Sequence, residues 1–264
     1  MRYYDAHCHL QDERLAGFQG EIFALYDRLG VEEVVVNGTG PEDWDAVAEM
    51  ARDSALVKPS FGLHPWKVNE VATHWKLILS QLWDYYPEAG VGEIGLDRWI
   101  EGHDLAKQEP AFLWQFAQAR ERDLPVSIHC LRAWGRMQEL LSEVSAPERG
   151  FLLHSYGGPA EMVKPFAKLG AYFSISGCFE LEKKEKQRAA LREIPLDRLL
   201  IETDAPDMRG PERERMYRCG RDETANHPAN IVHVYEFVAR LFEMPLEELV
   251  EQVEANYRTF FCGD

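Results

Sequence analysis

Eight short apolar segments, each followed by a stretch with helical spacing, run through this sequence and restrict its fold more than any other feature. The strand-like segments are residues 3–9, 33–37, 57–63, 90–94, 125–129, 151–154, 171–176 and 198–203. The helical stretches are 19–29, 41–52, 74–86, 105–122, 134–144, 159–169 and 183–193, with two more at 228–242 and 246–260. Strands that alternate with helices in this way pair in parallel, and eight such units close most naturally into a (β/α)8 barrel.

An open, doubly wound sheet is the alternative architecture for such a pattern. That fold carries a glycine-rich phosphate-binding turn after its first strand, and none follows residues 3–9. No linker rich in Pro, Gly or Ser separates two halves of the chain. We therefore expect α/β architecture with a single TIM-barrel domain over residues 1–264.

Composition limits the environment and the partners of the chain. Its 29 basic and 45 acidic residues give a formal charge of −16, which argues against non-specific coating of nucleic acid. The five cysteines are scattered, which favours reduced thiols over a disulfide framework. Met1 leads directly into strand-like sequence, so we expect no signal peptide, and no apolar run reaches the ~18 residues of a membrane span. These features predict a cytoplasmic protein that does not bind a membrane, and they imply no stable protein partner.

Polar residues of metal-binding type recur where the predicted strands end. A His-x-His pair such as His7 and His9 arises by chance about 0.3 times in a chain of this composition, so alone it is weak. A single histidine at a strand end more often bonds loop backbone than a metal. Here the whole set falls at the ends that meet at the mouth of a barrel, where active sites of this fold lie. The set comprises His7, His9, His64, Glu93, His129, His154 and Asp204.

The motifs around these residues resemble those of a known family. In order they are Asp5-Ala-His7-Cys-His9-Leu10, Gly62-Leu-His64-Pro-Trp66, Gly92-Glu93-Ile-Gly-Leu-Asp97, Pro125-Val-Ser-Ile-His129, Leu153-His154-Ser-Tyr-Gly-Gly158 and Ile201-Glu-Thr-Asp204-Ala-Pro206. Together they resemble the TatD family of metal-dependent hydrolases in the amidohydrolase superfamily, many of them described as 3′-exonuclease-type deoxyribonucleases. The resemblance covers nearly the whole chain, in the order and spacing of the family.

The resemblance implies a centre of two divalent metal ions. One ion would be held by His7, His9 and Asp204 and the other by His129 and His154, with Glu93 bridging the two. Two dications about 3.5–4 Å apart repel each other, and a bridging carboxylate screens that repulsion. Ligands rich in imidazole nitrogen favour zinc as the first choice, with magnesium or manganese possible.

Three further roles follow from the resemblance and from strand parity. Asp204 is a candidate general base or proton shuttle for the attacking water, the alternative being ligation alone. His64 is assigned to phosphate binding or to protonation of the leaving group, unless it is only a structural residue beside Pro65. Asp5 shares the strand face of His7 and His9, and we expect it to orient a ligand.

Departures from the family pattern make the substrate less certain than the chemistry. They are Arg98-Trp99-Ile100 after Asp97, Cys130-Leu131-Arg132 after His129, and His227 between Asn226 and Pro228. The loop after residue 204 carries Arg209, Arg213, Arg215, Arg218 and Arg221, which suit oxyanion recognition unless nearby acids cancel their charge. Trp66, Trp99 and Trp134 follow strands and could stack on bases or simply pack loops.

These observations predict a hydrolase for phosphoesters, with nucleic acid ends or nucleotide-like esters as substrate. We assign substrate binding to His64, Trp66, Arg209 and Arg213. The alternative within enzymes is hydrolysis of a small amide, ester or lactone. A metal-free barrel that acts as a binding or scaffold protein is the alternative from another class, and it would have lost ligands that this chain retains.

Overall fold

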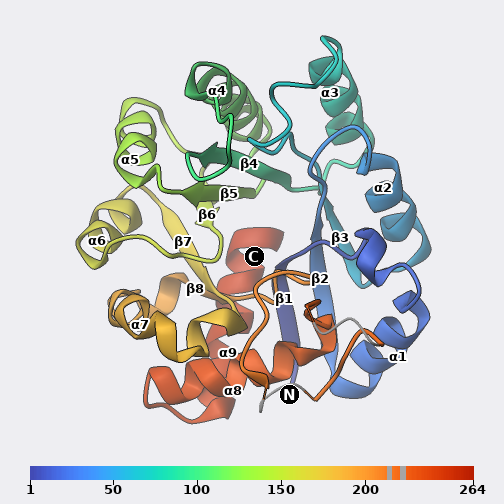
Figure 1. Ribbon diagram of the computed structural model, residues 1–264, viewed down its shortest axis with the longest axis vertical. Coiled ribbons are helices and arrows are strands. Elements are labelled where there is room, and N and C mark those ends of the chain that lie inside the picture. Colours follow the sequence, from blue (N-terminus) through green and yellow to red (C-terminus); the bar gives the residue numbers. More distant parts are fainter. Residues whose placement is uncertain (213–215, 221–223) are drawn as a thin grey trace.

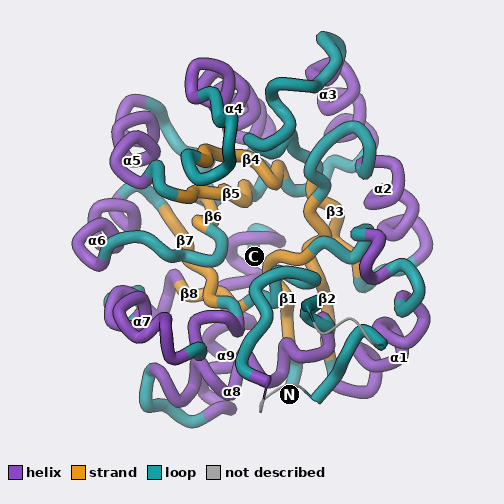
Figure 2. Tube along the Cα trace, viewed as in Figure 1, coloured by secondary structure: helices purple, strands orange, loops and turns teal. Residues whose placement is uncertain are grey.

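A closed (β/α)8 barrel is the architecture of the computed structural model, which describes residues 1–212, 216–220 and 224–264. The strands are β1 (Tyr3–Cys8), β2 (Val31–Asn37), β3 (Val57–Ser60), β4 (Val91–Asp97), β5 (Val126–Leu131), β6 (Phe151–Leu153), β7 (Ala171–Ile175) and β8 (Leu199–Ile201). The helices are α1 (Gln19–Leu29), α2 (Trp44–Asp53), α3 (Trp75–Tyr85), α4 (Leu105–Arg122), α5 (Trp134–Glu143), α6 (Ala160–Lys168), α7 (Glu185–Leu191), α8 (Ile231–Leu241) and α9 (Leu246–Tyr257). The strands form an inner ring and the helices an outer ring (Figures 1 and 2).

All strand pairs are parallel, as the alternating pattern predicts. Strands β1–β2–β3 and β4–β5–β6–β7–β8 form two continuous ladders. At one seam Gly90 N donates to Pro59 O (2.9 Å) and Gly92 N donates to Phe61 O (3.2 Å). At the other seam the Asp204 amide donates to His7 O at 2.9 Å. These hydrogen bonds close the barrel and bring the first and last strands together.

The expected boundaries differ from the observed ones by up to three residues, and two of these differences concern strands that carry site residues. Strand β3 stops at Ser60, so His64 lies in the loop beyond it, whereas β4 continues through Asp97. Helix α4 has the expected bounds and buries Phe112 and Phe116 against the barrel. Helix α1 ends as predicted at Gly30, whose φ of 79° suits a residue without a Cβ.

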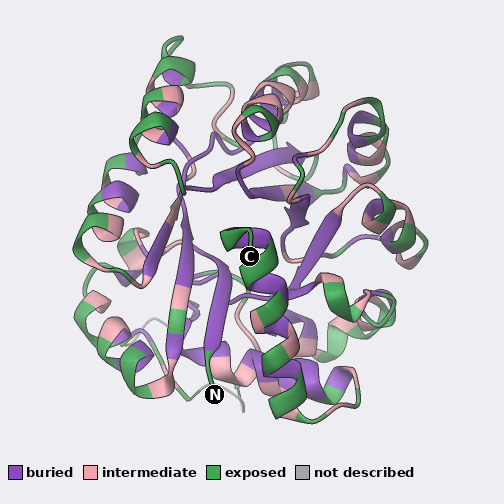
Figure 3. Ribbon diagram, turned by 180° about the vertical axis from the view of Figure 1, so that it is seen from behind, coloured by how far each residue is buried: buried purple, intermediate pink, exposed green. Residues whose placement is uncertain are grey.

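The floor of the barrel is apolar and is covered by the C-terminal segment. Tyr257, Phe260 and Phe261 pack with side chains from the strands in one buried cluster. The strand members of that cluster are Tyr4, Ala6, Val35, Leu152, Tyr172 and Leu200. Figure 3 shows this end from behind, with the C-terminus lying over the centre of the barrel. The opposite end is the mouth.

No helix within the described residues combines the length and the hydropathy that a membrane span requires.

Candidate metal centre

The carboxylate of Glu93 lies at the centre of a ring of imidazoles. Its Oε2 is 3.4 Å from His7 Nε2 and 3.3 Å from His9 Nε2. Its Oε1 is 2.9 Å from His129 Nδ1 and 2.8 Å from His154 Nε2. The two oxygens therefore face two pairs of histidines. One pair lies at the end of β1, and the other comes from β5 and the residue after β6.

Asp204 joins the pair that faces Glu93 Oε2. Its Oδ1 is 3.7 Å from His7 Nε2 and 3.4 Å from His9 Nε2. The residue has a φ of 50°, in the left-handed region that few non-glycine residues occupy, so the chain turns sharply as it leaves β8. Strain of this kind is concentrated at functional sites. The turn brings the Asp204 carboxylate within reach of His7 and His9 at the end of β1.

Partners behind the imidazoles orient the inward nitrogens. His9 Nδ1 lies 2.8 Å from Asn37 O, and because a carbonyl only accepts, this nitrogen carries the proton. Neutral His9 then presents a lone pair at Nε2. His7 Nδ1 lies 2.7 Å from Ser127 Oγ, and its Nε2 is 3.3 Å from that of His9. Two such nitrogens so close together are stabilised by a cation or proton between them.

His64 has the opposite polarity. Its Nδ1 accepts a hydrogen bond from the Trp66 amide at 3.2 Å, so in the neutral ring the proton sits on Nε2. That nitrogen faces Glu93 Oε1 at 3.3 Å. Burial lowers the pKa of His64 to about 4, which keeps the ring neutral near pH 7. His64 therefore offers an N–H donor to the centre.

Two carboxylates lie behind candidate ligand histidines on the outer side, and neither carboxylate has a role predicted from the sequence. Asp97 Oδ2 lies 2.9 Å from His129 Nε2. Glu202 Oε1 lies 3.5 Å from His154 Nδ1, and neither atom has a hydrogen-bond partner within the described structure. Both carboxylates lie inside motifs that the sequence displays, Gly92–Asp97 and Ile201–Pro206, and that position was the available signal.

The charge balance of the centre fits divalent cations. All five buried carboxylates of the described residues lie in or beside it; they are Asp5, Glu93, Asp97, Glu202 and Asp204. Within the described chain, every ion pair of Glu93 and Asp204 is made with a histidine, and none with lysine or arginine. Buried carboxylates need a compensating charge, which protonated imidazoles or bound metal ions supply. Among the residues that the structure describes, three groupings have the spacing to hold a metal ion: His7–His9–Asp204, His7–His154–Glu202 and His64–Glu93–His129.

Without metal, the centre balances its charge with protons. Burial opposes the charged form of His9, yet hydrogen bonds to Asp204 and Glu93 raise its pKa well above the usual range. His154 behaves alike: burial opposes its charge, and Glu93 and Glu202 raise its pKa well above the usual range. Burial would raise the pKa of Glu93, but the surrounding histidines hold it well below its ordinary value.

Asp5 supports the centre through the main chain. Its carboxylate accepts hydrogen bonds from Thr203 N (2.9 Å), Thr203 Oγ1 (2.6 Å) and His7 N (3.3 Å). It therefore contacts the backbone of one ligand candidate and the residue before Asp204, and none of these contacts is with an imidazole. Burial raises the pKa of Asp5 to about 8.

The residues expected to bind substrate are only partly brought together. Trp66 is 45% exposed and its ring meets those of His64 and His129 edge to face, with centroids 4.8 and 6.1 Å apart. Arg209 is partly buried in the loop after β8, and Arg213, Arg215 and Arg221 lie outside the described residues. Arg218 pairs with Glu212, so part of its charge is compensated.

Of the two roles that the sequence leaves open for Trp134, base stacking and loop packing, its ring contacts favour packing. Its ring packs against Tyr156 and Phe166, with centroids 4.8 and 6.2 Å apart. That aromatic cluster packs the start of α5 against its neighbours, as a structural tryptophan would.

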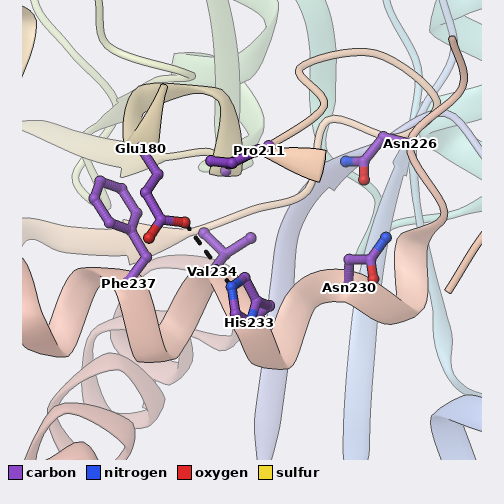
Figure 4. A pocket seen from close by; sticks show the side chains of 9 residues that line it. Glu180, Pro211, Asn226, Asn230, His233, Val234 and Phe237 are labelled. Atoms are coloured by element: carbon purple, nitrogen blue, oxygen red, sulfur yellow. Dashed lines mark ion pairs between the residues drawn. The ribbon is translucent and has the colours of Figure 1, made fainter. Parts of the chain in front are cut away.

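A separate small pocket lies between α8, the turn after β7 and the loop after β8 (Figure 4). His233 lines it and faces Glu180 at 3.9 Å. None of the six expected metal ligands lines this pocket. The candidate site is therefore the polar centre in the mouth.

Comparisons with known proteins agree with the fold. The family model described as TatD related DNase matches residues 4–262. The chain is 28% identical to the "Uncharacterized metal-dependent hydrolase YabD" of Bacillus subtilis, over 98% of each chain. It is also 28% identical to the "3′-5′ ssDNA/RNA exonuclease TatD" of Pantoea vagans, again over 98% of each.

A solved structure extends the similarity to three dimensions. The crystal structure of YjjV, a TatD homologue from Escherichia coli K12, superposes with a TM-score of 0.90 at 26% identity, covering 99% of this chain and 98% of that one. With the family model matching almost from end to end, this chain belongs to the TatD-related DNase family.

Proposed function

We propose that this chain hydrolyses phosphodiesters at nucleic acid ends or in nucleotide-like esters, using two divalent metal ions. The observation that carries the proposal is the division of four imidazoles between the two oxygens of Glu93. A carboxylate that bridges two cations requires such an arrangement. The relative from Pantoea vagans, named a 3′-5′ ssDNA/RNA exonuclease, supports nucleic acid as the substrate class.

Six residues would hold the ions, zinc being the first choice and magnesium or manganese possible. His7, His9 and Asp204 would hold one ion and His129 and His154 the other, with Glu93 between them. When bound, such ions lower the pKa of a coordinated water and offset the negative charge of a phosphoester. The inward lone pair of neutral His9 and the five buried carboxylates support this use of the site.

Two residues would handle protons and the leaving group. Asp204 Oδ1 faces the centre, so it can accept a proton from the attacking water. His64 is neutral and presents Nε2–H, so we assign it a hydrogen bond to a phosphate oxygen or to the departing oxygen. A neutral donor stabilises developing negative charge without itself carrying a charge. Arg209 and Trp66 would bind the rest of the substrate, and Arg213 keeps the same assignment from sequence.

The test is an assay of the purified protein on end-labelled single-stranded DNA, loaded in turn with Zn²⁺, Mn²⁺ or Mg²⁺. A parallel panel of esters, lactones and amides examines the alternative substrate class. We expect metal-dependent release of mononucleotides, lost in Glu93→Gln and retained in the exposed control Glu251→Gln. Hydrolysis of the ester panel with intact DNA, or DNA cleavage unaffected by Glu93→Gln, would refute the proposal.

A further inference from the structure

Asp97 is a buried carboxylate whose hydrogen bonds join the metal centre to the rim of the mouth. Besides His129 Nε2 at 2.9 Å, its Oδ2 accepts a hydrogen bond from Trp66 Nε1 at 2.7 Å. Its Oδ1 accepts from the amides of Trp99 (2.6 Å) and Ile100 (3.0 Å). One fully buried side chain therefore holds a ligand candidate and two segments that carry tryptophans.

Those two tryptophans, called here the tryptophan rim, are among the most exposed large apolar side chains of the molecule. Trp66 is 45% exposed and Trp99 is 55% exposed. The only polar atom of the Trp66 side chain is bound to Asp97, so what remains for a ligand is ring surface. Ring surface without a free donor recognises planar apolar groups, and every nucleobase has such a face.

The rim is also held rigidly from behind by α4. Gln115 Oε1 accepts from Leu63 N at 2.7 Å, in the loop that carries Trp66. Gln108 Oε1 accepts from Asp97 N at 2.9 Å, and its Nε2 donates to Asp97 O at 3.0 Å. Both glutamines are buried, and they lie seven residues apart on one face of the helix. Two buried amides thus fix both loops before any ligand arrives, which lowers the entropy lost on binding.

We propose that Trp66, anchored by Asp97, is a stacking platform for the base next to the scissile phosphate, and that Asp97 is the positioning residue that couples this platform to His129. The contact of Trp66 with the rings of His64 and His129 puts a stacked base directly beside the metal centre. The substrate class is accordingly a nucleic acid strand with unpaired bases. This inference rests on the proposed phosphodiesterase function.

The first test removes the indole and the base separately and together. Wild type and Trp66→Ala are compared on a single-stranded oligonucleotide and on one in which the nucleosides flanking the terminal phosphodiester are abasic. Stacking predicts that either removal alone raises KM about 5- to 150-fold, with kcat changing little. With both removed, the second loss should be less than about twofold, because the two partners form one interaction. The control is Tyr85→Ala, an exposed aromatic residue at the end of α3.

The outcomes separate the platform from the activity on which it depends. Equal KM values of the wild type for the two oligonucleotides would refute the stacking platform. So would increases in KM from the two single removals that multiply when both partners are removed. A wild type that cleaves neither substrate would overturn the proposed function, and this inference with it. Binding gives a readout without catalysis: in metal-free protein, oligonucleotide quenches tryptophan emission, and Trp66→Ala removes that quenching while Tyr85→Ala leaves it.

The second test concerns the coupling through Asp97. Asp97→Asn preserves shape but removes the charge that orients His129, so metal affinity measured by equilibrium dialysis should fall about 10- to 100-fold. Asp97→Asn should also lose the preference for the oligonucleotide with bases over the abasic oligonucleotide. Trp66→Phe keeps an aromatic face without the anchor, and it should retain metal affinity and part of that preference. Asp97→Asn with unchanged metal affinity, or with its base preference intact, would refute the coupling.

Discussion

The two ends of the barrel are built from opposite kinds of residue. At the mouth, five carboxylates are buried with a set of imidazoles. At the floor, Tyr257, Phe260 and Phe261 close the barrel with aromatic surface. Burial of apolar area stabilises a fold, whereas burial of carboxylates costs free energy unless each is paired. The comparison indicates that burial of aromatic surface at the floor stabilises the fold, whereas burial of carboxylates at the mouth destabilises it.

Acidification should weaken metal binding at the mouth. Because the pKa values of His9 and His154 are raised in the metal-free protein, metal must displace protons from these rings on binding. Each displaced proton costs up to about tenfold in affinity per pH unit below the pKa, so two cost up to about 100-fold per unit. Zinc affinity measured by competition with a chelator at pH 7.5, 6.5 and 5.5 checks this. An affinity that stays constant over this range would remove these histidines from the ligand set.

The same protonation should make the metal-free protein less stable as the pH rises. A raised pKa in the folded state stabilises the fold fully below the unfolded value of about 6.5, and that contribution is lost as the pH rises through the folded value. The melting temperature of the metal-free protein should therefore fall between pH 6.5 and pH 9. Metal replaces the protons, so the loaded protein should show a smaller fall, which calorimetry of both forms would measure.

At the floor, Phe260→Ala should reduce stability without changing the chemistry. Phe260 is fully buried, and deletion of a buried phenyl ring costs about 3–5 kcal/mol. Urea denaturation should show that loss, while kcat per folded molecule remains within about twofold of the wild type. The exposed control Leu77→Ala should change stability by less than about 0.5 kcal/mol. A floor variant with normal stability and reduced kcat would contradict the division between the two ends.

At the mouth, Glu93→Gln should have the reverse effect. It removes the carboxylate that faces four ligand histidines, so the rate of hydrolysis should fall more than about 100-fold. In the loaded protein, metal content measured by elemental analysis should fall with it. At alkaline pH, where the imidazoles have lost their protons, we expect the metal-free melting temperature to remain equal or to rise, because the variant removes a buried carboxylate that has no compensating charge. A large fall in that temperature would mean that Glu93 is chiefly a structural residue.

The smallest effect on metal binding should come from Glu202, which lies behind His154 on the outer side of the mouth. Glu202→Gln keeps the side-chain volume but loses the charge beside His154 Nδ1, so metal affinity should fall about 10- to 100-fold. Equilibrium dialysis measures this, and Glu251→Gln on the surface of α9 serves as the matched control. An unchanged affinity would show that His154 needs no carboxylate behind it.

The alternation of apolar segments and helices was sufficient to predict the barrel. Helix boundaries such as those of α1 and α4 followed from local spacing and from Gly30 at the end of α1. The set of candidate ligands was equally visible, because residues at the carboxyl ends of parallel strands meet at one mouth whatever the details of packing. These properties depend on periodicity along the chain, and periodicity is present in the sequence itself.

Only the tertiary structure determined which nitrogen of each ring faces the centre, and what lies behind it. His9 directly follows β1 and His64 lies in the loop after β3, and Asn37 O behind one ring and the Trp66 amide behind the other give the two histidines opposite polarity. The hydrogen bonds of Asp97 to Trp66 and His129 likewise join residues from three different segments. Such partners are set by barrel closure and by the register of neighbouring strands, and a hydrogen bond depends on distances of a few tenths of an ångström that residue order does not encode locally.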